Sequence, residues 1–200
     1  HASIDASLKR LNLDYVDLYQ VHGVDKETPL EETVRALDDL VRVGKVRYVG
    51  YSNFPAWQTM KALALADANK QARFVSAQMY YSIAGRDIER EVVPLALDQN
   101  LAILPWSPLA GGLLSGKFDA NKQGPAGARR SGFDFPPVDH GRLPGVLDAL
   151  RQVSQETGLS VARIALAWVL TRPFVTSVII GAKNPDQLAD NLAASDVTLT

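Results

Sequence analysis

The sequence predicts an α/β fold built on a parallel sheet, organised as a single domain over residues 1–200, and three observations predict it. Short runs rich in β-formers alternate five times with helical segments, which is typical of parallel strands joined by crossover helices. Hydrophobic residues make up 46% of the chain and charged residues 22%, so a chain of this length can bury a core. Cysteine is absent, which excludes disulfide frameworks and thiolate metal sites.

Each element is expected from its local pattern. Alternation and β-branched residues predict strands at residues 16–22, 46–53, 74–82, 101–109 and 176–182. Apolar residues spaced three or four apart predict helices at residues 2–11, 29–45, 55–69, 88–100, 145–158, 160–173 and 184–194. Gly44 ends the second helix, Pro94 kinks the fourth or shifts its start, and Ser160 is the expected N-cap of the sixth. Residues 110–142 are rich in Gly and Pro and predict a long loop.

Two architectures fit this alternation, an open doubly wound sheet and a (β/α)8 TIM barrel. The glycine fingerprint of doubly wound dinucleotide folds follows none of the five strands. A barrel has eight strands and typically about 250 residues, so five strands would form an incomplete portion of one. The chain begins inside an apparent helix without Met, which is typical of a fragment or a processed product. It is therefore expected to form either an open sheet or most of a barrel that lacks its first three units.

Charge and hydropathy narrow the range of partners. The net charge is −1, with 21 basic and 22 acidic residues, so no cationic surface for nucleic acid is expected. No apolar run approaches 18 residues and no signal peptide opens the chain, so we expect a cytoplasmic protein without membrane contact. Nucleic acid and a membrane are therefore not expected as partners, and the oligomeric state is left open.

Polar and aromatic side chains stand where the predicted strands end, which is where ligands bind in such sheets. In chain order these are His22, Ser52, Asn53, Gln78, Trp106 and Lys183. Each has an ordinary structural explanation when taken alone, as a turn residue, a helix cap, a core ring or a surface charge. Paired carboxylates and clusters of metal-binding residues are missing from these ends, which argues against glycosidase and metallohydrolase chemistry.

Taken together, the strand-end residues suit a flat heteroaromatic amide such as nicotinamide. Amide and hydroxyl groups can satisfy its carboxamide, and an aromatic ring can stack on its face. The loop with Gly111 and Gly112 is expected to expose backbone N–H groups to phosphate. The helix that begins after Gly181 favours an anion at its N-terminus, where Lys183 adds positive charge.

Five motifs give the chain a specific resemblance. In order along nearly the whole chain they are DYVDLYQVH (14–22), VRYVGYSNF (46–54), AQMYYS (77–82), PWSPLAGGLLSGKF (105–118) and IIGAKNPDQLADNL (179–192). With these motifs the chain resembles the aldo-keto reductase superfamily, most of all the branch of bacterial oxidoreductases and potassium-channel β-subunits. The resemblance implies a (β/α)8 barrel that binds NADPH/NADP+ at its C-terminal face and transfers hydride to an aldehyde or ketone.

The resemblance also implies a role for individual residues. The nicotinamide carboxamide would be held by Ser52, Asn53 and Gln78, and its ring would stack on Trp106. The residues expected along the pyrophosphate are Ser107, Leu109, Gly111, Leu113 and Lys117. Those expected at the adenosine 2′-phosphate are Gly181, Lys183 and Gln187, with Asp190 and Asn191 at the adenine.

His22 matches the active-site histidine of the superfamily, near the substrate carbonyl oxygen. The other members of its catalytic set are Asp, Tyr and Lys, and the resemblance implies that they precede residue 1. Tyr80 and Tyr81 are therefore not assigned as the proton donor. The loop at 117–142, with Arg129, Arg130, Phe133 and Phe135, has two open roles, as a cover over cofactor or substrate and as a solvent-exposed loop.

Three functions follow as hypotheses. The first is an NADPH-dependent oxidoreductase that reduces carbonyl compounds to alcohols. The second is a redox-sensing regulatory subunit that binds NADPH with little turnover. The third is an inactive fragment that binds nothing. NADPH titration followed by turnover with an aldehyde separates the three.

Overall fold

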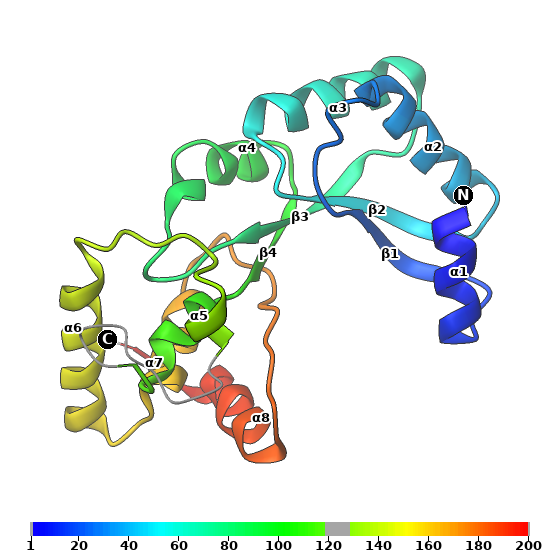
Figure 1. The fold of residues 1–200 in the computed structure, drawn as a ribbon. Coiled ribbons are helices and arrows are strands. Elements are labelled where there is room, and N and C mark those ends of the chain that lie inside the picture. The colour runs from blue at the N-terminus through cyan, green and yellow to red at the C-terminus, as the bar shows by residue number, and fades with distance from the viewer. Residues whose placement is uncertain (1, 119–128, 200) are drawn as a thin grey trace. The chain divides into compact units, whose positions relative to one another are not determined.

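The computed structural model describes residues 2–118 and 129–199 and has an α/β fold (Figure 1). A four-stranded sheet has the order β1-β2-β3-β4, and the first three strands pair in parallel. The strand bounds are β1 (Val16–Val21), β2 (Val46–Ser52), β3 (Phe74–Tyr80) and β4 (Ala102–Trp106). Residues 119–128 of the 117–142 loop lie outside the described residues.

The α-helices follow the predicted segments closely. Their bounds are α1 (Ala2–Leu11), α2 (Leu30–Arg42), α3 (Ala56–Asn69), α4 (Val92–Asp98), α5 (Arg129–Gly132), α6 (Leu143–Thr157), α7 (Val161–Leu170) and α8 (Pro185–Leu192). The described residues also form three 3₁₀ helices, η1 (Asp87–Glu89), η2 (Ala110–Ser115) and η3 (Ala193–Asp196). The predicted loop at 110–142 therefore contains two short helical segments, η2 and α5.

The strand order supports the barrel interpretation over the doubly wound one. A doubly wound sheet reverses its strand order at a switch point, whereas this order runs without reversal from β1 to β4. Helices α2 and α3 contact each other on one side of β1 and β2 (Figure 1). On the other face Leu18 and its register partner Tyr48 are exposed, Tyr48 by 58%. A parallel sheet covered by helices on one face is the local arrangement of a partial (β/α)8 barrel.

The described chain divides into two compact units. The first comprises residues 2–78 and 90–103, and the second comprises residues 79–89, 104–118 and 129–199. Strands β3 and β4 begin in the first unit and end in the second. The single-domain organisation stays a prediction.

The core of the first unit lies between the sheet and its helices. Tyr51 of β2 is fully buried, and its ring packs at 5.2 Å from Phe54 and 5.4 Å from Phe74. Burial raises the pKa of the Tyr51 hydroxyl, so this group stays protonated. Leu37 of α2 and Leu63 of α3 are buried on the same unit's helices, as the apolar spacing predicted.

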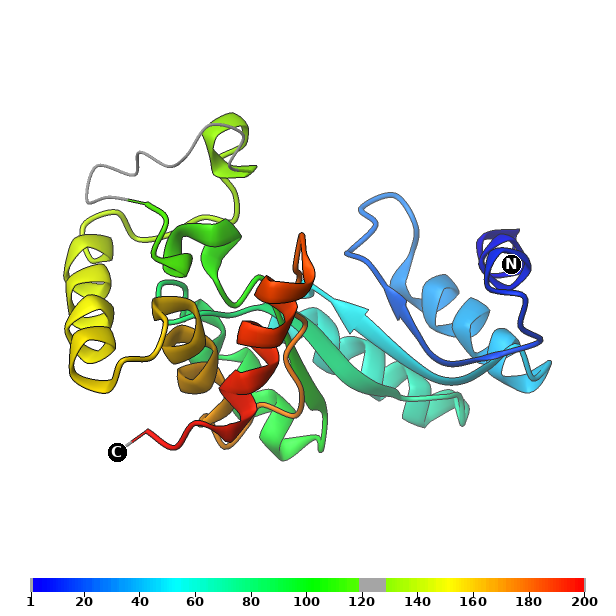
Figure 2. The same ribbon diagram turned by 90° about the horizontal axis from the view of Figure 1, so that it is seen from below.

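The core of the second unit forms around α7 (Figure 2). Helix α7 contacts α6, α8 and η2. Leu113 of η2, Leu147 of α6 and Ile164 of α7 belong to one buried cluster. The buried side chains of this cluster are each at most 4% exposed. Packing therefore anchors η2, the segment that follows β4.

Local signals fixed several helix ends. Gly44 follows α2 with φ +77°, the left-handed conformation that glycine adopts without strain. Pro94 is the third residue of α4, where the first-turn N–H that proline lacks has no partner inside the helix anyway. Ser160 caps α7 and accepts a hydrogen bond from the Arg163 N–H at 3.0 Å.

The strand predicted at residues 176–182 does not form in the structure. Over residues 176–182 the structure has one parallel bridge, between Trp106 and Ile179, in which the Ile179 N–H donates to the Pro105 carbonyl at 2.9 Å. Ile179 remains 41% exposed. An apolar run becomes a strand only where a neighbour pairs along its length, and the described residues supply a single bridge.

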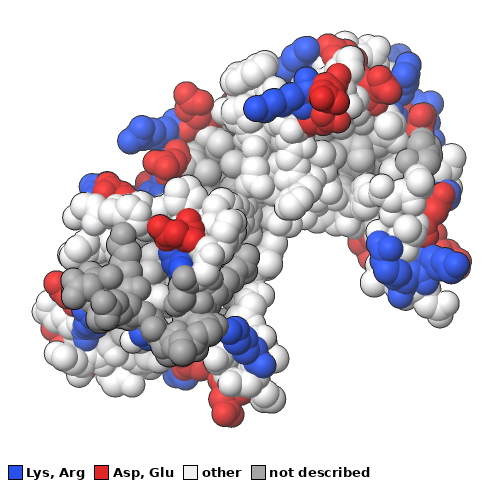
Figure 3. Space-filling view, viewed as in Figure 1, with Lys and Arg blue, Asp and Glu red and all other residues white. Residues whose placement is uncertain are grey.

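Basic and acidic side chains are interspersed on the face seen in Figure 3, without a continuous patch of either sign. None of the helices within residues 2–118 and 129–199 combines the length and hydropathy needed to cross a membrane.

Candidate functional site

Three of the predicted site residues in the first unit form one hydrogen-bonded group where β2 and β3 lie side by side. The Ser52 hydroxyl donates to the Gln78 carbonyl at 2.8 Å. The Asn53 side-chain amide donates to Ser52 Oγ at 2.9 Å, and the Asn53 backbone N–H donates to the Gln78 carbonyl at 3.2 Å. The structure therefore brings Ser52, Asn53 and Gln78 together, and their contact with nicotinamide stays a prediction.

Asn53 has an unusual backbone conformation. Its φ is +58°, in the left-handed region that asparagine tolerates better than most residues. This conformation ends β2, and the side-chain amide also reaches the His22 carbonyl at 3.4 Å. One asparagine thus connects the end of β2 to the residue that follows β1.

His22 stands directly after β1 and is exposed. Its backbone carbonyl is held by Asn53, which fixes the chain at this point. The imidazole is not buried among backbone groups, so the alternative of a satisfied core histidine does not describe it.

Three further residues, missed by the sequence analysis, extend this group across the sheet. Gln78 Nε2 donates to Gln20 Oε1 at 2.9 Å, and Gln20 Nε2 donates to Ser76 Oγ at 3.2 Å. Between them lies Gly50, the register partner of both Gln20 and Ser76. The available signal was strand alternation, because Gln20 lies two residues before His22 and on the same face.

In the second unit Trp106 ends β4 among other aromatic rings. Phe135 stacks on it at 5.7 Å with an interplanar angle of 19°, and Tyr80 lies at 5.2 Å with an angle of 42°. Phe135 from the 117–142 loop thus covers one face of the indole. The contact of Trp106 with nicotinamide stays a prediction.

The loop after Trp106 is tightly turned. Ser107, Ala110, Gly111 and Gly112 all have positive φ. The Gly111 N–H donates to Ser107 Oγ at 3.0 Å, and the Gly112 N–H donates to the Leu109 carbonyl at 2.9 Å. These two N–H groups, which the sequence analysis expected to be open to phosphate, are therefore satisfied within the loop.

A buried arginine holds this loop. Arg130 is 8% exposed, and its guanidinium donates to the Ala110 carbonyl at 2.8 Å and to Asp134 at 2.8 Å. A Cβ on Gly111 would lie 2.6 Å from the Phe135 carbonyl. Residues 130–135 therefore lie directly against the loop expected to bind pyrophosphate.

The remaining pyrophosphate residues differ in exposure. Leu113 is 1% exposed and belongs to the core of the second unit, whereas Leu109 is partly buried and Lys117 is exposed. Only the Lys117 side chain among these three offers a charge to an anion.

The predicted 2′-phosphate residues lie at or near the start of α8, whereas the predicted adenine residues lie near its end. Asn184 caps this helix by accepting from the Gln187 N–H at 2.9 Å, and Gln187 Oε1 accepts from the Lys183 N–H at 3.0 Å. The Lys183 side chain is exposed. The helix N-terminus is thus partly satisfied by its own residues, and the exposed charges beside it are Lys183 and the acidic Asp186.

Asp190 and Asn191 are committed to internal contacts. The Asp190 carboxylate accepts from Arg163 at 2.6 Å and from the Ser160 hydroxyl at 2.5 Å. Asn191 is 8% exposed and donates to the Gly181 carbonyl at 3.2 Å. Their predicted contact with adenine stays a prediction, while their contacts here join α8 to α7 and to the segment before it.

Neither Tyr80 nor Tyr81 is prepared to act as an acid. Burial raises the pKa of both hydroxyls. The Tyr81 hydroxyl donates to Glu89 at 2.6 Å, and the hydrogen bond and charge of Glu89 raise the Tyr81 pKa further.

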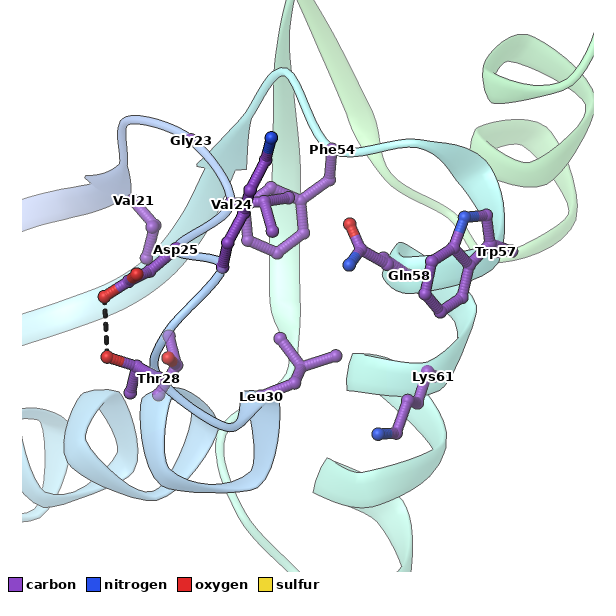
Figure 4. Close-up of a pocket in the computed structure, with 12 residues that line it drawn as sticks. Val21, Gly23, Val24, Asp25, Thr28, Leu30, Phe54, Trp57, Gln58 and Lys61 are labelled. Atoms are coloured by element: carbon purple, nitrogen blue, oxygen red, sulfur yellow. Dashed lines mark hydrogen bonds between the residues drawn. The ribbon is translucent and has the colours of Figure 1, made fainter.

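A separate cavity of about 320 Å³ lies in the first unit between the segment after β1 and the start of α3 (Figure 4). In Figure 4 the side chains of Trp57, Gln58 and Lys61 come from α3, and Asp25 is hydrogen bonded to Thr28. The Thr28 hydroxyl lowers the pKa of the Asp25 carboxyl. None of the sequence-predicted site residues lines this cavity.

Within the part of the chain that the structure describes, no three His, Asp or Glu side chains converge in a way that could hold a metal ion. The candidate site therefore consists of amide, hydroxyl, imidazole and aromatic groups.

Comparison with known proteins agrees with this chemistry. The model of the "Aldo/keto reductase family" matches residues 1–200. "Uncharacterized oxidoreductase YrpG" of Bacillus subtilis is 40% identical over 196 residues, which cover 98% of this chain and 58% of that protein. "Versiconal hemiacetal acetate reductase" of Aspergillus parasiticus is 34% identical over 208 residues, covering 99% of this chain and 57% of that protein.

A third relative is named as a channel subunit and not as an enzyme. "Probable voltage-gated potassium channel subunit beta" of Arabidopsis thaliana is 38% identical over 202 residues, which cover 96% of this chain and 60% of that protein. The chain thus spans between 57% and 60% of the length of these three relatives.

Proposed function

The chain belongs to the aldo/keto reductase family, and on that premise we propose that the whole protein is an oxidoreductase that reduces aldehydes or ketones to alcohols with NADPH. The single observation that carries the proposal is the hydrogen-bonded group of Ser52, Asn53 and Gln78 beside His22. These residues lie where three adjacent strands end, which is where barrel enzymes bind their ligands.

The chemistry of this group fits a nicotinamide. A carboxamide has two N–H donors and one acceptor oxygen, and it is recognised by side chains that supply both donors and acceptors. Asn53 and Gln78 have side-chain amides, and the Ser52 hydroxyl holds the Asn53 amide and the Gln78 backbone carbonyl. NADPH, when bound, supplies the hydride, and the protein supplies binding, orientation and polarisation.

His22 is the residue we propose for polarising the substrate carbonyl. Negative charge develops on a carbonyl oxygen as it is reduced, and an N–H donor directed at that oxygen stabilises the charge. His22 is exposed, and its backbone is held in place through Asn53. Both properties support a contact with substrate rather than a packing role.

Residues of the second unit are proposed to bind the rest of the cofactor. Trp106 supplies an indole ring, on which Phe135 stacks in this structure, and Lys183 supplies an exposed positive charge beside the start of α8. A lysine acts as a point charge toward phosphate. We therefore assign Lys183 to the 2′-phosphate, the group that separates NADPH from NADH.

A second candidate function is a regulatory subunit that binds NADPH with little turnover. The observation that favours it is the 38% identity to the Arabidopsis protein named as a potassium-channel β-subunit. The two candidates share the cofactor site and differ in turnover.

The experiment is an NADPH titration of the whole protein, followed by steady-state turnover with 4-nitrobenzaldehyde. Saturable binding with turnover supports the reductase. Binding without turnover favours the regulatory subunit. A protein that is folded and binds no NADPH would refute both.

A further inference from the structure

A row of polar groups crosses the first three strands on the face opposite α2 and α3. Gln20 of β1, Gly50 of β2 and Ser76 of β3 are register partners. Gln20 Nε2 donates to Ser76 Oγ at 3.2 Å, and Gln78 Nε2 donates to Gln20 Oε1 at 2.9 Å. The two ends of the row thus stand on β1 and β3, with β2 between them.

Gly50 makes this crossing possible. A Cβ at this position would lie 2.2 Å from Ser76 Oγ and 3.2 Å from Gln20 Cγ. Any larger residue would therefore occupy the space through which the Gln20 side chain reaches β3. The glycine is required by close approach of side chains and not by its own backbone angles.

The row gives the side-chain amide of Gln78 one direction. Its nitrogen faces Gln20 Oε1, so its oxygen faces away from Gln20. While Gln20 Nε2 donates to Ser76 Oγ, turning the Gln78 amide over would set its oxygen against Gln20 Oε1 and lose the 2.9 Å hydrogen bond. Gln78 therefore presents an acceptor, not a donor, toward the end of the sheet.

We propose that Gln20 is a positioning residue that acts through Gln78, holding the Gln78 amide so that Oε1 accepts an N–H of the nicotinamide carboxamide. The inference rests on the proposed function, because it assigns to Gln78 a contact with the nicotinamide carboxamide of the cofactor. Gln20 itself touches no cofactor in this scheme. Its effect is to select one of the two orientations of a neighbouring amide.

The test compares two ligands that differ only at the carboxamide. NADPH has an amide N–H₂ there, and the reduced 3-acetylpyridine analogue has a methyl ketone without an N–H. The variant is Gln20→Met, which keeps the length of the side chain and removes both hydrogen bonds. Dissociation constants are measured by fluorescence titration of the whole protein, with circular dichroism to check folding.

The expected result is selective. In Gln20→Met the dissociation constant for NADPH rises about two- to ten-fold, the equivalent of one net hydrogen bond. The constant for the acetylpyridine analogue stays as in the parent protein, because that ligand donates nothing to Gln78. Gln20→Glu keeps an acceptor toward Gln78 Nε2, so it should bind NADPH more tightly than Gln20→Met does.

Three results would overturn the inference. Equal NADPH binding by the parent and Gln20→Met means that Gln20 positions nothing. Equal weakening of both ligands means that Gln20 only supports the strands. A folded parent that binds neither ligand refutes the proposed function and this inference with it, whereas the first two results leave the proposed function intact. Gln152→Met, on the exposed face of α6, is the matched control and should bind both ligands like the parent.

Discussion

Substitution of Gly50 by alanine tests the packing of the sheet most sharply. The added Cβ would lie 2.2 Å from Ser76 Oγ, 3.1 Å from the Ser76 carbonyl oxygen and 3.2 Å from Gln20 Cγ. The hydroxyl can rotate away, but only by giving up the hydrogen bond from Gln20. The carbonyl belongs to the neighbouring strand and cannot rotate, so β2 and β3 must shift apart.

The free energy of unfolding is expected to fall by about 1–2 kcal/mol. Overpacking a well-packed site costs roughly 1–3 kcal/mol. Alanine restricts the unfolded chain more than glycine does, and this offsets the cost by about 0.4–1 kcal/mol. The net effect remains destabilising because the closest contacts include backbone.

Urea unfolding followed by circular dichroism measures the effect as a lower midpoint at an unchanged slope. The matched control is Gly145→Ala in α6, where an added Cβ meets nothing within 4 Å. That substitution should stabilise the protein by about 0.5–1 kcal/mol, because alanine suits a helix interior better than glycine. If Gly50→Ala is as stable as Gly145→Ala, the described crossing of β2 by Gln20 is wrong. The double variant Gly50→Ala/Ser76→Ala should recover part of the loss, since the nearest clash is gone.

Three further predictions concern the second unit. Trp106→Ala should weaken NADPH binding several-fold in a fluorescence titration, since an aromatic pair contributes about 0.5–1.5 kcal/mol beyond burial; unchanged affinity in a folded variant removes Trp106 from the site. Lys183→Ala should raise the dissociation constant for NADPH roughly ten-fold more than that for NADH, because a charged hydrogen bond to phosphate is lost; equal changes identify Lys183 as a surface charge only. The Arg86 guanidinium and the Tyr81 hydroxyl lower the pKa of Glu89 below its ordinary value in the folded state. The ionised Glu89 carboxylate therefore stabilises the fold above about pH 4.5, and this stabilisation is lost as the pH falls through the lowered pKa. Glu89→Gln should therefore be less stable than the parent at pH 7, with a difference that shrinks on acidification in urea-unfolding series; a constant difference would contradict the linkage.

Much of the fold could be predicted because the signals are local. The segment at 29–45 has its apolar residues on one face and Gly44 at its end, and α2 forms there. Ser160 was recognisable as a cap from its residue type and position, and it does cap α7. The apolar residues at 176–182 wrongly predicted a strand, because a strand forms only where a neighbouring strand pairs with it. The bridge at Ile179 is all that this stretch obtains from β4 in the described residues.

The candidate site was predictable only in part, for a related reason. Ser52, Asn53 and Gln78 were found because they stand at strand ends, where a parallel sheet collects its polar groups. Gln20 lies inside an apolar strand, and its partner Ser76 is 56 residues away. A contact at that separation depends on strand register, which local pattern does not give. The stacking of Phe135 on Trp106 could not be predicted either, because it joins residues that are distant in the sequence.

The measurement that tests the account most directly is the turnover of His22→Ala in the whole protein, with NADPH and 4-nitrobenzaldehyde. If His22 stabilises the charge on the carbonyl oxygen, its removal should lower kcat by about 10²–10³. The dissociation constant for NADPH should stay within about two-fold of the parent value, because a contact made only in the transition state leaves cofactor binding intact. A folded variant that reduces the aldehyde at the parent rate would contradict the assignment of His22 to the carbonyl oxygen.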